Sequence, residues 1–350
     1  MPTKEGTVFQ YFRPRMIIFP VVIGMAVLAW AFIQKFEAEA FLKIEWTAMS
    51  ILWMMLVVMM IAVRQFFYTW RIRLLTNQQL SWRASLESIL LWEFSSAATP
   101  SAVGGTAAAL FILTKEGVRP GKTAAIVLCT IFLDMTFLMG LLTGVLIWFD
   151  FKMLIPISDL ETFNTTLFIS TFTLLLGYAI LAAYGLFVNP TRLKKLLVKA
   201  SGYGFLKRWQ GSAELIGQQL VEASIELQQK SISFWIKAFG MTIMTWSGRF
   251  LVGNCIVMVL VPEFAEHVLL YARQLVLMIM LMMSPTPGGS GVAELSFPSF
   301  LGDLIDQGLI PPITAIWRTL TYYPYLFIGL AILPKWVSRV YDQKPTEIGS

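Results

Sequence analysis

The sequence predicts an all-α polytopic membrane protein, and three observations support that prediction. Of the 350 residues, 57% are hydrophobic and only 14% are charged, and the mean hydropathy is +0.68, which is unlike a soluble globular domain. Several apolar stretches reach the roughly 20 residues that an α-helix needs to cross about 30 Å of hydrocarbon. Alternating strands of about 10 residues, which a transmembrane barrel would need, are not found in the sequence.

We expect a single membrane domain over residues 1–350, with about six full spans and two broken hairpins. The first span could be mistaken for a signal peptide. The residues after it, Gln34-Lys-Phe-Glu37, do not resemble a small-residue cleavage site, so we interpret it as a retained span. The six spans are predicted at residues 16–33, 46–63, 123–149, 165–187, 232–261 and 314–333.

Basic loops predict the orientation, because Lys and Arg concentrate on the cytoplasmic side of a membrane protein. The loop at residues 64–84 contains four arginines and no acid, and residues 190–212 contain six basic residues and no acid. Both segments and both termini are therefore expected in the cytoplasm. The basic run Arg192–Arg208 would also attract anionic lipid headgroups, at about 1 kcal/mol per charge. Helical spacing predicts an amphipathic surface helix at residues 212–229.

The segment 85–118 predicts a broken hairpin. Residues 85–98 and 106–114 are each too short to cross a bilayer as a helix, and Thr99-Pro-Ser-Ala-Val-Gly-Gly105 separates them. Basic residues flank both sides, so a hairpin that enters and leaves on the cytoplasmic side fits the pattern. One deeply kinked span is the alternative, although it would place basic loops on both sides of the membrane.

A second broken hairpin is predicted from residues 268–283 and 291–304. The turn Ser284-Pro-Thr-Pro-Gly-Gly-Ser-Gly291 joins the two arms, and its prolines cannot donate backbone hydrogen bonds while its glycines relax the backbone. A break at membrane depth is tolerated only where the backbone is packed in protein or lines a wet cavity. The turn is therefore a candidate site.

The two halves predict an inverted repeat, the first at about residues 16–149 and the second at about 165–334, with a basic and amphipathic cytoplasmic linker at 188–230. Both breaks contain a Thr-Pro pair and a Gly-Gly pair. Inverted repeats with broken helices near the midplane are typical of transporters. Any six-span protein divides into halves of opposite sense by parity, so the prediction depends on the matched breaks.

Four ionisable residues are predicted inside the membrane: Asp134, Arg249, Glu294 and Arg318. Asp134 lies about 11 residues into its span, roughly 17 Å deep at about 1.5 Å per residue. Charged side chains are costly in hydrocarbon, so they usually pair or face a polar cavity. One interpretation is a structural ion pair of Asp134 with Arg318 or Arg249. The other is a site for a charged headgroup, whose phosphate an arginine would bind through its planar fork.

The helices that follow the two Gly-Gly breaks are expected to point free backbone N–H groups at the tips of the hairpins. The positive end of each helix dipole lies at the same place. Two tips that meet from opposite faces would form an anion-binding centre. A phosphodiester or water would satisfy the N–H groups there.

Metal and cofactor sites find little support in the sequence. Cys129 and Cys255 fall in apolar segments, as small buried residues do, and His267 is the only histidine. A histidine metal centre or a Ser-His triad is therefore not expected. Residues 288–291, Gly-Gly-Ser-Gly, lack the Lys-Ser/Thr of a P-loop. We expect no cofactor, no metal and no nucleic-acid partner.

The motifs at the two breaks resemble those of the lysylphosphatidylglycerol synthase transmembrane region family, also called the flippase-like membrane domain family. The resemblance covers nearly the whole chain. Many members carry Glu and Arg just after the first Gly-Gly, where this chain has Thr106 and Ala109. The matching residues are Arg71-Ile-Arg73, Thr99-Pro100, Gly104-Gly105, Gly117-Val118, Asp134, the signature Pro285-Thr-Pro-Gly-Gly-Ser-Gly-Val-Ala-Glu294, and Arg318.

The resemblance implies a multi-pass protein of a bacterial or archaeal cytoplasmic membrane that moves a lipid between leaflets. The sequence contains no aminoacyl-transferring domain, so no synthase activity is expected. The expected partner is an anionic or aminoacylated lipid, either a phospholipid or a polyprenyl-phosphate-type lipid, and a homo-oligomer stays open. The expected substrate-binding residues are Thr99, Pro100, Gly104, Gly105, Asp134, Arg249, Pro287, Gly288, Gly289, Gly291, Glu294 and Arg318.

Two alternatives from other classes stay open at this point. One is a membrane enzyme or accessory subunit that acts on a lipid-linked substrate, in which carboxylates such as Glu93, Asp134 and Glu294 would do acid–base chemistry. The other is an ion-coupled solute transporter. A cavity open sideways to lipid would favour a lipid substrate, and a sealed cavity would favour a solute.

Overall fold

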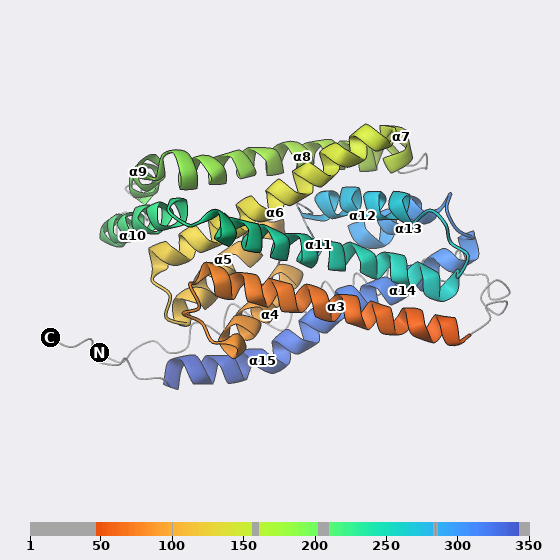
Figure 1. The fold of residues 1–350 in the computed structure, drawn as a ribbon, viewed down its shortest axis with the longest axis horizontal. Helices are drawn as coiled ribbons and strands as arrows, with labels where there is room; N and C mark the ends of the chain where they lie inside the picture. The colour runs from red at the N-terminus through yellow and green to blue at the C-terminus, as the bar shows by residue number, and fades with distance from the viewer. Residues whose placement is uncertain are drawn as a thin grey trace.

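The computed structural model describes residues 47–99, 101–155, 161–201, 210–282, 284 and 286–342, and every regular element among them is helical (Figure 1). The span predicted at residues 16–33 lies outside the described residues. The first half contains α3 (Ala48–Leu75), α4 (Trp82–Ala98), α5 (Ser101–Lys115), α6 (Pro120–Trp148) and the short α7 (Phe151–Leu154). The middle and second half contain α8 (Glu161–Ala183), the π-helical turn η1 (Tyr184–Val188), α9 (Pro190–Ser201), α10 (Gln210–Gln228), α11 (Ile232–Leu260), α12 (His267–Met282), α13 (Val292–Leu301), the 3-10 turn η3 (Gln307–Leu309), α14 (Ile310–Thr321) and α15 (Tyr323–Asp342).

In the described part of the chain, four helical stretches are long and apolar enough to cross a membrane: Ala48–Leu75, Pro120–Trp148, Thr165–Val188 and Ile232–Leu260. They correspond to four of the six predicted spans, so the prediction of a multi-pass helical membrane protein is confirmed at this level. Large apolar side chains are exposed on their outer faces, as expected of surfaces that contact lipid tails, and examples are Ile51, Met55 and Ile180.

Helix α3 is longer than predicted. The cytoplasmic loop predicted at residues 64–84 is wrong up to Leu75, because the helix continues without interruption through Arg64 and Arg71. Both arginines are buried and each is paired with a carboxylate, so their charges do not force the chain out of the bundle. Helix α3 packs along most of α11, and α11 is the more deeply buried of the two.

Helices α4 and α5 pack against each other as a hairpin whose break is shorter than predicted. Helix α5 begins at Ser101, so Gly104 and Gly105 lie inside it, and their prediction as part of the break is wrong. A Cβ atom on Gly105 would lie 1.9 Å from the hydroxyl oxygen of Ser96, and one on Gly104 would lie 2.1 Å from that of Thr99. The two glycines therefore allow the helices to approach closely.

Helices α12 and α13 are joined by an open turn, and the break predicted there is confirmed. Gly288, Gly289 and Gly291 have φ angles of 58°, 68° and 84°, a region that L-residues avoid. In Figure 1 the α4–α5 hairpin lies towards the left end of the long axis and the α12–α13 hairpin towards the right end. The entry of the two hairpins from opposite membrane faces, and the inverted repeat itself, stay predictions.

The closing span predicted at residues 314–333 consists of two helices. Helix α14 ends at Thr321 and α15 begins at Tyr323. Pro324 has no N–H to donate to the carbonyl group four residues earlier, which weakens a continuous helix at the point where the two helices separate. The break at Tyr322 is a feature that the sequence analysis missed.

Helices α9 and α10 pack against each other, and α10 also packs against α6. Leu220, Ala223 and Leu227 are buried on α10, which confirms the helix predicted at residues 212–229. Arg192 and Lys195 are exposed on α9. Their attraction for anionic headgroups stays a prediction.

Candidate functional site

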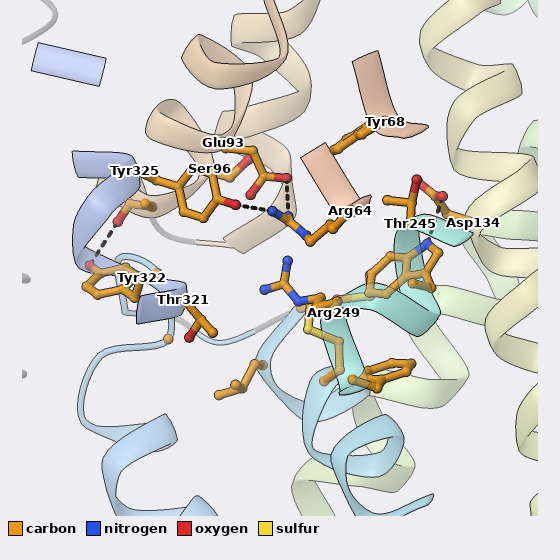
Figure 2. A pocket seen from close by; sticks show the side chains of 18 of the residues that line it. Arg64, Tyr68, Glu93, Ser96, Asp134, Thr245, Arg249, Thr321, Tyr322 and Tyr325 are labelled. Atoms are coloured by element: carbon orange, nitrogen blue, oxygen red, sulfur yellow. Dashed lines mark hydrogen bonds and ion pairs between the residues drawn. The ribbon is translucent and has the colours of Figure 1, made fainter. Parts of the chain in front are cut away.

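A cavity of about 260 Å³ lies inside the bundle, between the two hairpins and the helices around them (Figure 2). Its wall combines charged and aromatic side chains with apolar ones, which is unusual at the centre of a membrane protein. The charged residues that line it are Arg64, Arg71, Glu93, Asp134, Arg249 and Arg318. The aromatic residues are Tyr68, Trp92, Tyr178, Trp246, Phe250, Trp317, Tyr322 and Tyr325.

The structure brings five of the predicted site residues to this cavity: Asp134, Arg249, Gly288, Gly289 and Arg318. The other predicted residues lie behind the wall or within the hairpins. Glu294 and Gly291 lie beyond Arg318 at the start of α13, and Thr99, Gly104 and Gly105 are packed within the α4–α5 hairpin. Pro287 does not line the cavity, and Pro100 lies outside the described residues.

Arg64 lies between an acid and a tyrosine. Its Nη2 atom is 2.6 Å from a carboxylate oxygen of Glu93 on α4, and its Nη1 atom donates to the hydroxyl oxygen of Tyr325 on α15. Figure 2 shows this arrangement, with the guanidinium group of Arg64 between the two partners. The pair joins α3 to the first hairpin and to the closing helix.

Arg71 lies two helical turns further along the same face of α3 and pairs with Asp134 on α6. Two hydrogen bonds of 2.5 and 3.3 Å join the guanidinium group to the two carboxylate oxygens. The indole N–H of Trp246 donates to the same carboxylate at 2.9 Å, and Arg71 also donates to Thr242 at 2.8 Å. The predicted pairing of Asp134 with Arg318 or Arg249 is therefore wrong. Asp134 instead pairs with Arg71, which lies in the part of α3 that was predicted to be a loop.

Arg318 pairs with Glu294, and both side chains are almost completely buried. The Nε atom of Arg318 is 2.6 Å from a carboxylate oxygen of Glu294. The second carboxylate oxygen accepts a 2.7 Å hydrogen bond from the backbone N–H of Gly291, the residue before α13. Free N–H groups were predicted at this tip. That prediction is wrong for Gly291, because Glu294 supplies the anion from within the same chain.

Arg249 on α11 differs from the other three arginines. Among the described residues, no carboxylate forms an ion pair with it, and Figure 2 draws no hydrogen bond to its guanidinium group. The contact the structure gives it is with the ring of Trp246, at 5.8 Å from the centroid. The charge of Arg249 interacts electrostatically with those of Arg64 and Glu93, so Arg249 lies close to the ion pair that these two residues form. Its planar fork of donors is therefore available to a ligand.

Tyr322 connects the two hairpins. Its hydroxyl group donates to the backbone carbonyl of Ala97, next to the first break, and accepts a hydrogen bond from Ser290 in the second. Both hydrogen bonds are 3.2 Å long. Its ring also lies under the guanidinium group of Arg318, at 4.0 Å. The break between α14 and α15 thus places one residue in contact with both turns.

The sequence analysis missed Arg64 and Arg71 as site residues because it assigned them to a cytoplasmic loop. Arg64, Tyr68 and Arg71 follow one another at intervals of four and three residues, which places them on one face of a helix. All three line the cavity. This spacing is the signal that could have identified the face. Their acidic partners are distant in sequence and could not be paired from it.

The arrangement is suited to binding an anion. Among the described residues, three arginines of the cavity are neutralised by carboxylates, and Arg249 is left with free donors in a partly open space lined by many aromatic side chains. Hydrogen bonds between a guanidinium group and a phosphate oxygen are charge-assisted and frequently bidentate. Hydroxyl groups such as that of Ser96 also border the space and could donate to a polar ligand.

Comparison with known proteins agrees with these features. A curated relative from Archaeoglobus fulgidus, described as a UPF0104 membrane protein, is 27% identical over 288 residues, which are 79% of this chain and 85% of the relative. No solved structure gives a significant match. The family profile described as "Lysylphosphatidylglycerol synthase TM region" matches residues 17–329. The chain therefore belongs to the lysylphosphatidylglycerol synthase TM region family.

Proposed function

We propose that this protein moves a membrane lipid with a charged headgroup between the two leaflets of the cytoplasmic membrane. The headgroup would enter the cavity, and the acyl tails would stay in the surrounding lipid. The observation behind this proposal is Arg249, a cation with no carboxylate partner among the described residues, inside a bundle of helices long enough to span a membrane.

The physical obstacle to such movement is the desolvation of the headgroup. A charged group at the centre of a bilayer costs several kcal/mol or more, as it does for a charged side chain. A cavity with a complementary charge and polar donors replaces the lost water, and the apolar outer faces of the helices leave the tails in a favourable environment.

The family supports a lipid substrate. Its name refers to the membrane region of a synthase of lysylphosphatidylglycerol, which is a phospholipid with a charged headgroup. The paired breaks around the cavity supply the second argument, because broken helices at a central site are a feature of transporters that expose a site alternately to each side.

Leaflet exchange in liposomes tests the proposal. Purified protein is reconstituted into liposomes with a fluorescent phospholipid, and the fraction accessible to an external quencher is followed over time. We expect Arg249→Ala to slow exchange at least about tenfold, because a charge-assisted hydrogen bond contributes about 1.5–3 kcal/mol. Lys237→Ala removes an exposed cation from the same helix outside the cavity, and it should exchange lipid like the wild type.

Two results would contradict the proposal. One is equal exchange by the wild type, Arg249→Ala and protein-free liposomes. The other is conversion of the lipid to a new product by protein in detergent, where no leaflets exist. The second result would identify an enzyme.

A further inference from the structure

We propose that the cavity selects lipids whose headgroup carries one negative charge in a single phosphodiester, and that Arg249 is the residue that determines this selectivity. The inference rests on the proposed function, since it names the class of lipid that the same cavity would take. It follows from the charges of the wall and from the partners that each charge already has.

Among the described residues, the charges that line the cavity and their ion-pair partners sum to one net positive charge. Four guanidinium groups belong to the cavity, and three of them pair with Glu93, Asp134 and Glu294 at 2.6, 2.5 and 2.6 Å. The remaining guanidinium group is that of Arg249. A phosphodiester monoanion would neutralise this charge, and the guanidinium fork matches the geometry of its two free oxygens.

A ligand could bind the three paired arginines only by breaking their ion pairs, which costs free energy. Arg64, Arg71 and Arg318 have side chains only 6%, 1% and 4% exposed. Taking the carboxylate away from any of them would leave a buried charge without a partner, which is strongly unfavourable. A dianionic phosphomonoester would therefore find one free cation and leave one negative charge uncompensated.

A cationic headgroup meets the opposite problem. In the part of the chain that the structure describes, every carboxylate at the cavity already accepts a hydrogen bond from an arginine, so an ammonium group finds no open anion there. Aromatic rings can also hold ammonium groups, but five of the eight aromatic rings of the wall already face arginines. Tyr325 faces Arg64, Tyr68 faces Arg71, Trp246 faces Arg249, and both Trp317 and Tyr322 face Arg318. An aminoacylated lipid with net positive charge would bind more weakly than the same lipid without the amino acid.

Competition binding in detergent micelles tests the selectivity separately from transport. Fluorescent phosphatidylglycerol, with one negative charge, is bound to the purified protein, and unlabelled phosphatidylglycerol, phosphatidic acid and lysylphosphatidylglycerol compete for it. We expect phosphatidylglycerol to compete at least about tenfold more strongly than either of the others. Glycerophosphoglycerol, which has the phosphodiester without acyl chains, should compete weakly. Equal competition by it would show that the ligand is a soluble phosphodiester and would contradict the lipid part of the proposed function.

Variants test the role of each charge. Arg249→Gln should remove the preference for phosphatidylglycerol. Glu93→Gln adds a second uncompensated cation and should shift the preference towards phosphatidic acid near pH 8, where that lipid approaches two charges. The double variant Arg64→Gln/Glu93→Gln removes one charge of each sign, so it should keep the single-charge preference whatever its affinity. Lys237→Gln is the control outside the cavity.

The outcomes separate the inference from the proposed function. If lysylphosphatidylglycerol or phosphatidic acid competes as well as phosphatidylglycerol with the wild type, the inference is overturned, and leaflet exchange can still hold. If phosphatidylglycerol binds selectively through Arg249 but does not change leaflets in liposomes, the proposed function is overturned and the selectivity stands. Unchanged selectivity in Arg249→Gln also overturns the inference.

Discussion

The two hairpins use the same residue types for different physical purposes. In the α4–α5 hairpin, Gly104 and Gly105 lie inside a regular helix and allow it to contact α4 closely. In the α12–α13 hairpin, Gly288 and Gly289 adopt positive φ angles and form an open turn. A Gly-Gly pair in a membrane protein therefore does not by itself predict a break, since close packing between helices requires the same residues.

The hairpins also differ in how they hold charge. The second contains its own carboxylate, Glu294, which binds the N–H of Gly291 and pairs with Arg318 beside the turn. The first has no described charge at its turn, and its acid, Glu93, lies on α4 and pairs with Arg64 of α3. The second hairpin is thus locked internally by the hydrogen bond between Glu294 and Gly291, although Glu294, like Glu93, also pairs with an arginine of a neighbouring helix. The predictions below test this difference, beginning with the largest expected effect.

Removal of the internal acid should damage the second hairpin most. Glu294→Ala leaves Arg318 buried without a partner and the N–H of Gly291 without an acceptor. We expect a loss of about 3–5 kcal/mol in the free energy of unfolding, because breaking a buried ion pair on one side leaves an uncompensated charge. Thermal unfolding in detergent measures the change.

The double variant is the control for this first prediction. Glu294→Ala/Arg318→Ala removes both charges, so it should be more stable than Glu294→Ala alone. If the loss of stability in the double variant, relative to the wild type, equals the sum of the losses in the two single variants, the two residues act independently. That result would contradict a stabilising ion pair between Glu294 of the hairpin and Arg318 of α14.

Substituting alanine for one glycine in each hairpin should distinguish a glycine that forms a turn from a glycine that allows close helix packing. Gly288→Ala places a Cβ atom 2.2 Å from the ring of Tyr322 at a φ of +58°, so both backbone strain and overpacking apply, at about 1–3 kcal/mol each. Gly105→Ala meets only the Ser96 hydroxyl at comparably short range. Ser96→Ala should therefore restore part of the stability lost in Gly105→Ala. No recovery, measured by thermal unfolding, would show that Gly105 is not a packing residue.

The hydrogen bonds that join the two hairpins should have a smaller effect. Tyr322→Phe removes the hydroxyl group that bonds Ala97 and Ser290, at a cost of about 1 kcal/mol. Tyr323 is a matched control, because its buried hydroxyl group has no hydrogen-bond partner among the residues that the structure describes. Tyr323→Phe should be neutral or slightly stabilising. Equal effects of the two substitutions would mean that the link between the hairpins contributes nothing.

The sequence predicted the class of the fold and the region of the site, but not the partners within it. Apolar length alone identified four spans, and proline with glycine identified both breaks. Arg249 and Arg318 were expected in a polar cavity, since a charged side chain in contact with hydrocarbon is costly. Both residues line the cavity.

Pairing could not be predicted because it depends on contacts between distant parts of the chain. Arg71 and Asp134 are 63 residues apart and meet only because α3 continues past the arginines, against the usual preference of basic residues for loops. Once Arg64 pairs with Glu93, Arg71 with Asp134 and Arg318 with Glu294, Arg249 is left without a carboxylate partner among the described residues. A single error in the end of α3 therefore changed the assignment of the charges around it.

The base of the second hairpin offers the smallest and most specific test. Arg273 on α12 donates to both carboxylate oxygens of Asp303, at 2.5 and 2.8 Å, and these hydrogen bonds hold the pKa of Asp303 below its ordinary value. The base of the first hairpin is instead held by Arg339 of α15, which pairs with Glu87 and Glu116. The internal lock thus extends along the second hairpin, and Asp303 gives it a dependence on pH.

A carboxylate with a lowered pKa stabilises the fold above its unfolded pKa, about 3.9 for Asp, and loses that contribution as the pH falls through the lower folded value. Asp303→Asn should therefore be less stable than the wild type at pH 7, and the difference should shrink as the pH falls below the unfolded pKa and through the lower folded pKa. We expect less than about 1 kcal/mol, because the Asp303 side chain is 52% exposed and solvent screens the pair. Arg273 keeps the backbone carbonyls of Met153 and Phe300 as acceptors for Nε and Nη1, and the amide oxygen of the new asparagine is left to accept from Nη2. Thermal unfolding between pH 7 and pH 3 measures the difference, and a difference that stays constant over this range would exclude an ionised Asp303 as its source.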